Sequence, residues 1–255
     1  MTKNKKCIIL THQFLLPEDD ARSYGSHSRW GDAWKVETFN FCISHFVENN
    51  PDTMIVITGH GKTPPKHILE KADKYFWSPE IIEGEIGFGH PFLVSKGLEI
   101  AKKEGVSHAL KTRLDSVNLV RNIVDFCDRQ LRNTNKSIIT TSYSNRKYSL
   151  MDLLNYGSID DLLSIYDYRD PRPAWCRNGT ALVANNYVEK ILKKDVHFPF
   201  KPKEWEAMVK EKVHVMQPSE LKWIDLREHN SLLNTSRDFI INNEFEKLSK
   251  FVWKH

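Results

Sequence analysis

Short apolar runs that end in polar residues alternate with helix-like stretches along the first half of this sequence. The runs "KCIILTHQF" (residues 6–14) and "TMIVITGHG" (residues 53–61) each have the pattern of a buried strand with polar or glycine residues at its carboxyl end. Residues 33–47, between them, carry apolar side chains at helical spacing. A strand, a helix and a second strand in this order predict a right-handed βαβ unit. We therefore expect an α/β fold built around a parallel sheet.

The alternation of strands and helices continues to about residue 145. The pattern predicts a short strand at "ADKYFWS" (72–78), a helix from Pro91 to about Lys103, a strand ending on Asp115, an amphipathic helix at "VNLVRNIVDFCDRQL" (117–131) and a strand at "SIITTSYS" (137–144). Further helical stretches are predicted near residues 159–166 and 185–193. The predicted class is a Rossmann-like α/β fold with a mainly parallel sheet.

Composition limits the function classes. Of the 255 residues, 40% are hydrophobic and 27% are charged, as in an ordinary globular protein that can bury one sizeable core. The net charge of +4 is spread along the chain, so wholesale nucleic-acid binding is not indicated. No apolar run approaches the roughly 18 to 20 residues that span a bilayer. The four cysteines form no CxxC pair, which predicts neither a zinc site nor a disulfide framework and favours the reducing cytoplasm.

The strand "ALKTRLDS" (109–116) carries two cations and one acid on the same side. Side chains alternate along a strand, so Lys111, Arg113 and Asp115 share one face and Leu110, Thr112 and Leu114 share the other. Ligands of α/β proteins bind outside the carboxyl ends of the strands, where Asp115 lies. The alternative is structural: Lys111 and Arg113 pair with acids of a neighbouring element, and Asp115 caps a helix beginning near Asn118.

Three segments carry a resemblance to a known family. The strand "ALKTRLDS" resembles the Lys/Arg-Thr-Arg-x-Asp strand of the WavE-like lipopolysaccharide glycosyltransferases. The segment "YSLMDLLNYGSIDDLLSIYD" (148–167) is similar to that family's Asp-x-x-x-x-Gly segment, and "TFNFCISHFVENNPDTMIVITGHG" (38–61) looks like its first helix and second strand. The matches are short and fall in the first two-thirds of the chain.

The resemblance implies a single GT-A-like (Rossmann-like) domain over residues 1–255. Residues 1–145 would bind a nucleotide-sugar donor, and the mixed region 146–255 would face a saccharide or glycan acceptor. The implied activity is transfer of a sugar from a nucleotide-diphosphate sugar to that acceptor, without nucleic-acid partners. Peripheral association with a membrane stays open. The sequence does not specify the sugar, the nucleotide, the acceptor or the stereochemical outcome.

The resemblance also implies a divalent metal, Mn²⁺ or Mg²⁺, with Asp115 as its ligand. GT-A proteins present an Asp-x-Asp motif, whereas Asp115 is followed by Ser116, Val117 and Asn118. A single carboxylate can hold such an ion when the diphosphate and waters supply the other oxygens. Lys111 and Arg113 could neutralise part of the diphosphate charge in its place.

Candidate residues follow for each part of the reaction. For the phosphates and the sugar we select Lys96 and the residues around the strand that ends on Asp115, namely Lys111, Arg113, Asp115 and Ser116. For the nucleoside we select the polar ends of the first two strands, Thr11, His12, Gln13, Thr58, Gly59 and His60. As catalytic base we select Asp152, with Asp161 and Glu204 in reserve. The alternative role for Asp152 is the N-cap of a helix that "LLNY" begins.

Two other function classes compete with a transferase. A non-catalytic relative would bind a nucleotide or glycan without turnover, and the missing second aspartate favours it. Another α/β enzyme, such as a nucleotidyltransferase or a phosphate-ester hydrolase, would also end a strand on a metal-binding acid. Neither a Gly-rich activation loop near the first strand nor an Asp-x-Asp-x-Thr strand is present to favour that enzyme class.

Overall fold

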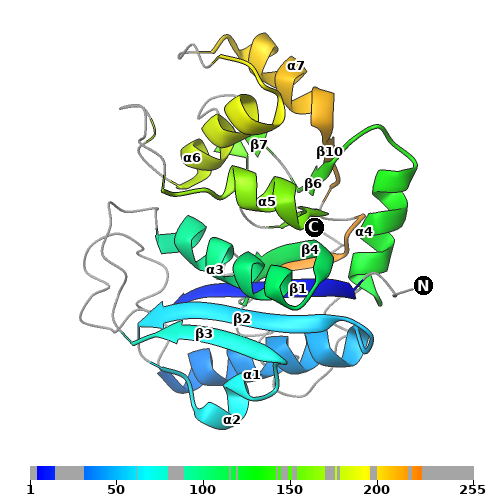
Figure 1. Cartoon of the computed structure of the whole chain (residues 1–255). Helices are drawn as coiled ribbons and strands as arrows, with labels where there is room; N and C mark the ends of the chain where they lie inside the picture. The colour runs from blue at the N-terminus through cyan, green and yellow to red at the C-terminus, as the bar shows by residue number, and fades with distance from the viewer. Residues whose placement is uncertain are drawn as a thin grey trace, which may run out of the picture.

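The chain forms an α/β structure in which one large sheet lies between two layers of helices (Figure 1). The structure is a computed structural model, and it describes residues 5–14, 32–61, 63–79, 89–114, 116–118, 120–141, 143–144, 149–150, 154–169, 176, 179–195, 200–217 and 220–225. Within these residues, no helix is both long enough and apolar enough to cross a membrane.

The central sheet has seven strands in the order β10-β6-β9-β4-β1-β2-β3. Their bounds are Lys5–Phe14 (β1), Met54–Gly61 (β2), Lys74–Ser78 (β3), Val106–Arg113 (β4), Ile138–Thr140 (β6), Asn155–Ser158 (β9) and Val213–Val215 (β10). Strand β9 runs antiparallel to both of its neighbours, and the other paired strands of this sheet are parallel. The predicted Rossmann-like α/β class with a mainly parallel sheet is confirmed.

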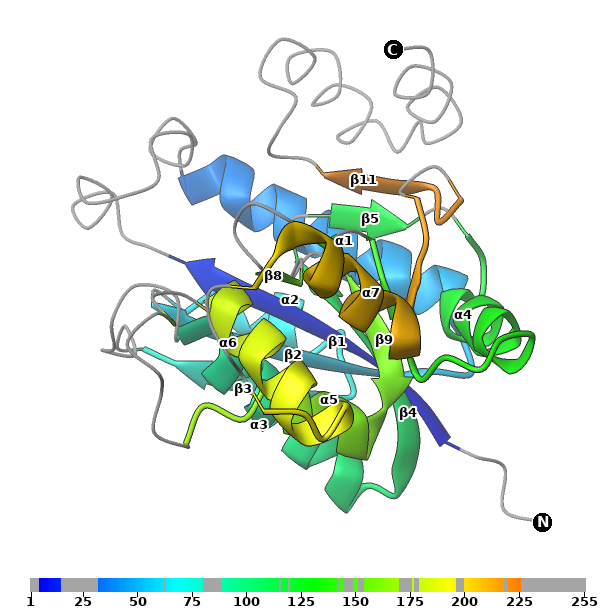
Figure 2. The same cartoon turned by 90° about the horizontal axis from the view of Figure 1, so that it is seen from above.

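The helices divide between the two faces of the sheet. One face is covered by α1 (Asp32–Asn49), α2 (Lys66–Leu69) and α4 (Ile123–Arg132), and the other by α3 (Gly89–Lys103), α5 (Ile159–Ile165), α6 (Gly179–Asn186), a π-helix (Tyr187–Ile191) and α7 (Pro202–Lys212). Two small antiparallel pairs complete the structure: β5 (Ser116–Asn118) with β11 (Trp223–Asp225), and β7 (Tyr143–Ser144) with β8 (Ser149–Leu150). Figure 2 shows β5 and β11 beside α1.

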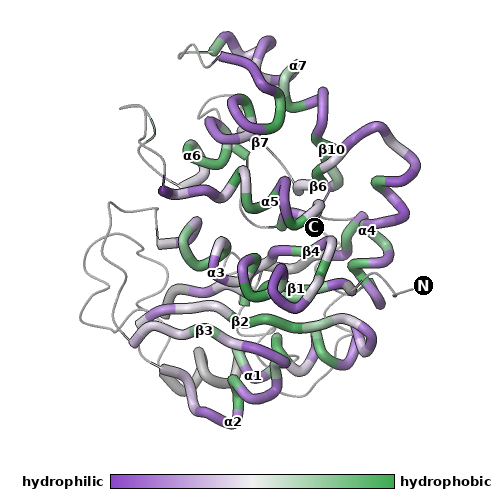
Figure 3. The backbone as a smooth tube through the Cα atoms, in the orientation of Figure 1, coloured by the Kyte–Doolittle hydropathy of each residue, from purple (hydrophilic) through white to green (hydrophobic). Residues whose placement is uncertain are grey.

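The apolar runs of the sequence become the innermost strands. In β1 the side chains from Cys7 to Leu10 are all fully buried, because helices cover both faces of the sheet. Ile8 and Leu10 pack toward α1, while Cys7 and Ile9 pack toward α3. Figure 3 shows the hydrophobic tube of β2 between the two helical layers. A continuous apolar run, rather than an alternating one, is what two covered faces require.

One predicted helix begins later than its sequence pattern indicates. Residues 117–131 were expected to be helical throughout, but Ser116–Asn118 form β5 and the helix starts at Ile123. Strand β5 pairs with β11, in the last part of the described chain, with Val117 opposite Ile224. The helical pattern at residues 117 and 118 is therefore overridden by pairing with a distant segment.

A second prediction is wrong around residue 155. A helix was considered to begin in "LLNY", but Asn155–Ser158 form β9, which inserts between β4 and β6. The predicted strand 137–144 is two separate pieces, β6 and β7. Because β9 and β10 belong to the same sheet as β1, both predicted halves of the chain, 1–145 and 146–255, contribute to it.

Candidate functional site

The parallel strands β1, β2 and β4 end at the same edge of the sheet, and polar side chains gather there on the α3 face. Thr11 of β1 lies opposite Thr58 of β2 on one side and Arg113 of β4 on the other. Thr11 and Thr58 are buried, and Arg113 is half-buried. The edge where strands end is where α/β proteins place their ligands.

A second row of polar residues lies one step deeper in the sheet. The strand register places Lys111 of β4 beside Asn155 of β9, and Asn155 beside Thr140 of β6. All three residues have 0% exposed surface. The register also places Lys111 beside Ile9, which packs against α3, so the row faces α3 and α5. We call Lys111, Asn155 and Thr140 the polar row.

Lys111 is the charged residue of the polar row. A lysine is almost never fully buried, because removing its ammonium group from water is costly unless anions or hydrogen-bond acceptors surround it. In a region of low dielectric, its attraction for an anion is also stronger than at the surface. The position of Lys111, two residues from the end of β4, therefore suits the binding of a negatively charged group.

Asn155 is oriented by a tyrosine. Its side-chain Nδ2 donates a hydrogen bond of 2.7 Å to the hydroxyl of Tyr166, the residue that follows α5. Tyr166 is itself fully buried, and its ring makes an edge-to-face contact with the imidazole of His90, with 6.1 Å between centroids. The polar row is thus connected to the first turn of α3.

The two threonines at the strand ends, Thr11 and Thr58, differ in the hydrogen bonding of their hydroxyl groups. The Thr11 hydroxyl donates to the carbonyl of Thr112 at 3.3 Å. The Thr58 hydroxyl is buried and has no hydrogen-bond partner within the described residues. The Thr58 methyl group lies under α3, because a Cβ atom on Gly97 would come within 3.3 Å of it. Thr58 therefore supplies a polar atom at the base of α3.

His60 lies against the amino-terminal end of α3. A Cβ atom built on Gly89 would be 3.1 Å from Cε1 of His60, so glycine allows this close approach. Burial lowers the pKa of His60 to about 4, so its imidazole is neutral at neutral pH. The amino terminus of a helix carries unsatisfied N–H groups and a partial positive charge, which favours anions at the same edge.

Three of the predicted nucleoside or sugar residues lie on the opposite side of the sheet. His12 packs on Phe39 of α1 with ring centroids 4.4 Å apart. Gly59 lies under the ring of Trp77, which leaves no space for a side chain. The Ser116 hydroxyl donates to the carbonyl of Arg113 at 2.9 Å. These residues do not join the polar row.

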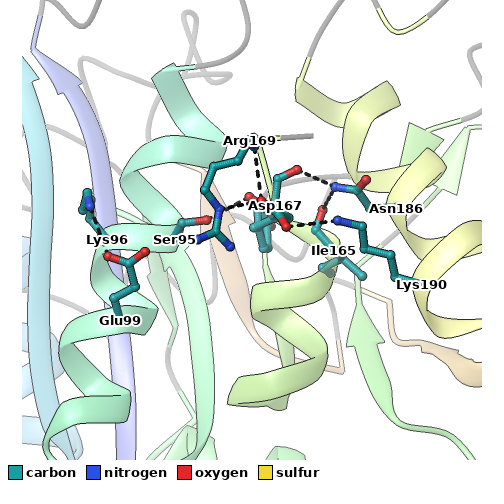
Figure 4. A network of polar contacts seen from close by, with 9 residues as sticks. Ser95, Lys96, Glu99, Ile165, Asp167, Arg169, Asn186 and Lys190 are labelled. Atoms are coloured by element: carbon teal, nitrogen blue, oxygen red, sulfur yellow. Dashed lines mark hydrogen bonds and ion pairs between the residues drawn. The ribbon is translucent and has the colours of Figure 1, made fainter. Parts of the chain in front are cut away.

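Lys96 lies on α3 and contacts its own helix (Figure 4). Its ammonium group forms an ion pair of 3.1 Å with Glu99 and lies 5.5 Å from the centre of the Phe92 ring. These two contacts hold the Lys96 side chain at the surface of α3. They do not bring it into contact with Lys111.

The two reserve acids lie away from the polar row. Asp161 is in the first turn of α5, and its backbone N–H is capped by the Ser158 hydroxyl at 3.1 Å. Ser158 pairs with His108 near the start of β4, so Asp161 lies at the opposite edge of the sheet from Arg113. Glu204 is exposed, and its carboxylate accepts the backbone N–H of Lys201 at 3.2 Å in a capping box.

Some predicted site residues lie outside the described residues. These are Asp115 and Asp152, together with the side chain of Gln13, whose backbone pairs with His60. Among the described residues, no group of three or more His, Cys, Asp or Glu side chains could hold a metal ion. Asp115 as a metal ligand and Asp152 as a base therefore stay predictions.

The structure adds residues that the sequence did not indicate. Asn155 was not selected, because the segment that carries it was considered only as the possible start of a helix, and Tyr166 was assigned only to the predicted helical stretch 159–166. Thr140 lies in the predicted strand "SIITTSYS", and its polar side chain at the end of an apolar run was the one available signal. Their relation to Lys111 depends on strand register, which short and weakly apolar strands do not specify.

No protein-family model and no curated protein matches this sequence. Comparison with solved structures gives matches at low identity. A cytidylyltransferase from Leptospira borgpetersenii has a TM-score of 0.43 at 11% identity, covering 82% of this chain and 95% of that one. A 4-diphosphocytidyl-2C-methyl-D-erythritol synthase from Anaerococcus prevotii has a TM-score of 0.43 at 13% identity, and the match covers 84% of this chain and 89% of that one. Mouse xyloside xylosyltransferase 1 has a TM-score of 0.43 at 9% identity, and the match covers 84% of this chain and 86% of that one. At these scores the likenesses do not decide the activity.

Proposed function

We propose that this chain is a nucleotide-sugar-dependent glycosyltransferase that moves a sugar from a nucleotide-diphosphate sugar to a saccharide or glycan acceptor. The observation that supports this most directly is the fully buried Lys111 near the carboxyl end of β4, with Arg113 one step further out on the same face. Two cations near the end of β4, on the face of the sheet that α3 covers, match the needs of a diphosphate.

The reaction requires the bond between the anomeric carbon and a diphosphate oxygen to break. The electron pair stays on the diphosphate, whose negative charge increases in the transition state. Arg113, which is half-buried, stabilises that charge by electrostatic attraction and hydrogen bonds, and the buried Lys111 adds electrostatic attraction from below. Thr11 and Thr58 line the same strand ends. Because Lys111 is removed from water, its effect on the developing charge is greater than that of a surface lysine.

The acceptor hydroxyl forms the new bond to the anomeric carbon and gives up its proton. If the configuration inverts, a carboxylate must take that proton on the side opposite the leaving diphosphate. We assign this role to Asp152, which precedes β9 in the sequence. The WavE-like resemblance of the segment 148–167 favours a glycan of the lipopolysaccharide type as the acceptor. The four cysteines without a CxxC pair favour the cytoplasm as the place of reaction.

A divalent metal would be held mainly by Asp115 and the diphosphate itself. The charged groups described around the polar row are the cations Lys111 and Arg113, which fit an anion, whereas Mn²⁺ and Mg²⁺ prefer carboxylate oxygens such as that of Asp115. When bound, such an ion would add positive charge next to the leaving diphosphate. A titration of transfer against Mn²⁺ and Mg²⁺, in the wild type and in Asp115→Asn, tests this part. Equal metal dependence in both proteins would remove Asp115 from the assignment.

A binding screen followed by a product assay tests the function. Thermal shifts with UDP-, GDP-, CMP- and dTDP-sugars would identify the donor, because a ligand that binds the folded state raises the melting temperature. The selected donor is then incubated with a panel of saccharide acceptors. Release of the nucleoside diphosphate with sugar transfer supports the proposal. Release of pyrophosphate from a nucleoside triphosphate would indicate a nucleotidyltransferase, and binding without any release would indicate a non-catalytic protein.

A further inference from the structure

Three aromatic rings form a row across the amino-terminal part of α3. Phe92, in the first turn of α3, contacts both Phe76 on β3 and Tyr168, which follows α5. The centre of the Phe92 ring is 6.1 Å from that of Phe76 and 5.2 Å from that of Tyr168, and both contacts are edge-to-face. All three residues are half-buried, so each keeps part of its surface in contact with solvent. We call Phe76, Phe92 and Tyr168 the aromatic strip.

The aromatic strip lies on the same face of the sheet as the candidate site and begins near the same edge. Phe76 is the cross-strand neighbour of Thr58, whose methyl group lies under α3. Phe92 comes three residues after Gly89, where α3 contacts His60. A ligand on the aromatic strip would therefore lie beside the strand ends to which we assign the diphosphate of the donor.

An ion pair on α3 borders the aromatic strip (Figure 4). Lys96 and Glu99 lie about one and two turns after Phe92, on the same side of the helix. Nζ of Lys96 is 5.5 Å from the centre of the Phe92 ring and 3.1 Å from Oε2 of Glu99. The two side chains keep 32% and 34% of their surface exposed, so a ligand in solution can reach both charged groups.

A second set of charges comes from the segment that carries Tyr168. The Asp167 carboxylate accepts hydrogen bonds from Arg169 at 2.9 Å and from Lys190 at 3.0 Å. The Arg169 side chain nevertheless keeps 66% of its surface exposed. Its pKa is raised by the hydrogen bond to Asp167 and, to a smaller extent, by the charge of Glu99, so the two charged borders lie close together.

The backbone on which Tyr168 is placed is held by two other helices. The Asn186 amide, from α6, donates to the carbonyl of Asp167 at 2.8 Å. The Ser95 hydroxyl, from α3, donates to the carbonyl of Tyr166 at 2.8 Å. A ligand that packs on Tyr168 therefore meets a surface that is already ordered, which lowers the entropic cost of binding.

We propose that the aromatic strip and its charged border bind the saccharide of the acceptor. This inference rests on the proposed function for the role of that saccharide as an acceptor. A pyranose ring presents C–H groups that pack on an aromatic ring, and its hydroxyls both donate and accept hydrogen bonds. Glu99 supplies an acceptor, and Lys96 and Arg169 supply donors. Because each of these charges has a partner of opposite sign, the surface suits a neutral, hydroxyl-rich ligand better than an ion.

The test substitution removes one ring of the aromatic strip. Lactose, maltose and cellobiose serve as neutral pyranose probes, and saturation-transfer NMR titrations measure their dissociation constants. In Tyr168→Ala we expect at least one probe to bind about two- to tenfold more weakly than in the wild type, because an aromatic contact is lost. Tyr168→Phe keeps the ring and should retain most of the affinity. Melting temperatures of the variants show that they are folded.

Tyr75→Ala is the matched control. Tyr75 is an exposed tyrosine next to Phe76 on β3, and its cross-strand neighbour Ile57 packs toward α1, on the other face of the sheet. This variant should bind the probes as the wild type does. If the wild type binds none of the three probes, or if Tyr168→Ala binds them with unchanged affinity, the saccharide site is rejected.

Sedimentation velocity tests the other class of occupant, a second copy of this chain. A wild-type dimer that becomes a monomer in Tyr168→Ala would assign the aromatic strip to contact between copies and overturn the saccharide site. A wild type and a variant with the same sedimentation coefficient support it.

The kinetics of transfer separate this inference from the proposed function. With the donor from the binding screen, Tyr168→Ala should raise KM for the acceptor and leave KM for the donor unchanged. Transfer with an unchanged acceptor KM would overturn the saccharide site and leave the proposed function standing. Probe binding that depends on Tyr168, in a protein that transfers no sugar, would support the saccharide site and reject the proposed function.

Discussion

Lys111 combines two properties that an ordinary structural lysine does not have: complete burial and a place at the end of a central strand. Burying an ammonium group weakens its hydration, and the protein must offset that cost with nearby acceptors or anions. Arg113, on the same face, keeps part of its surface exposed. The two residues therefore form an inner and an outer cation, and their loss should have different consequences.

Lys111→Met and Arg113→Ala should each weaken nucleoside diphosphate binding more than nucleoside binding. For the buried Lys111 we expect a loss of about tenfold, since its charge acts on the anion through a region of low dielectric. The loss should be smaller for Arg113, where water screens the charge. Calorimetric titrations with UDP and uridine, or with GDP and guanosine, measure the difference. Equal losses for both ligand classes would point to a structural role for these cations.

Asp152→Asn should reduce turnover while nucleotide-sugar affinity stays nearly unchanged, if Asp152 is the base of an inverting reaction. Loss of an interaction made only in the transition state has this effect on kcat without raising KM. Steady-state kinetics with the donor identified by the binding screen measure both constants. Activity within a few-fold of wild type would remove Asp152 from the mechanism and leave the search for a base open.

At the scale of elements, α3 is the helix that brings the site together. It packs on β1 and β2 through Gly97, where a Cβ atom would be 2.5 Å from Cγ2 of Ile9. Its amino terminus contacts His60 through Gly89. These two glycines therefore allow α3 to lie close to the sheet. The distance between α3 and the sheet in turn determines how closely the helix covers the ends of the strands.

Gly97→Ala should destabilise the fold even though alanine is the better helix former. The gain in helix propensity is about 1 kcal/mol, whereas forcing a methyl group into a packed core costs roughly 1–3 kcal/mol. We therefore expect a net loss of up to about 2 kcal/mol in the free energy of unfolding, measured in urea. Lys103→Ala, on the exposed side of the same helix, is the control and should change stability by less than about 0.5 kcal/mol.

The elements that the sequence predicted well are those with long apolar runs. β1, β2 and α3 follow directly from their patterns, because their burial is nearly continuous or regularly spaced. β9 could not be recognised, since "NYGS" has no apolar run and is held by pairing with β4 and β6 on either side. β5 depends in the same way on β11. Short strands of this kind are specified by partners distant in sequence.

The candidate site was predicted only in part, for the same reason. Thr11 and Thr58 were selected because they follow apolar runs, and Lys111 and Arg113 because they share a strand face with Asp115. The register brings these four residues to one face of the sheet. His12 follows the same run but points to α1, which strand alternation alone could have indicated. Tyr166 comes from a segment whose folding back onto β9 has no local signal.

At the scale of the whole molecule, His60 and Asp167 make the free energy of unfolding depend on pH, each over its own pH range. His60 has its pKa lowered by burial to about 4 from an ordinary value of 6.5. Partial burial would raise the pKa of Asp167, but its bonds to Arg169 and Lys190 lower it to about 2 from 3.8. Both shifts mean that the unfolded chain binds protons more readily than the folded one, so acid favours unfolding.

The free energy of unfolding should therefore fall as the pH drops from about 6.5 to 4, by at most about 3 kcal/mol from His60. It should fall again between about pH 4 and 2, as Asp167 is protonated. Urea denaturation across this range measures the slope. His60→Gln should reduce the loss above pH 4 without abolishing it, because burial also lowers the pKa of His45. An unchanged slope in that variant would contradict the assignment.

The antiparallel strand β9 also affects the order in which the molecule can assemble. β1, β2, β3 and β4 are contiguous in the sheet and are complete once residue 113 has been made. β6 and β10 join them only through β9, whose residues come later in the chain than β6. Pairing that waits for a distant segment is slow, because a long loop must close first. During synthesis, Lys111 would thus be present well before Asn155, and the polar row would be complete only after β9 has inserted between β4 and β6.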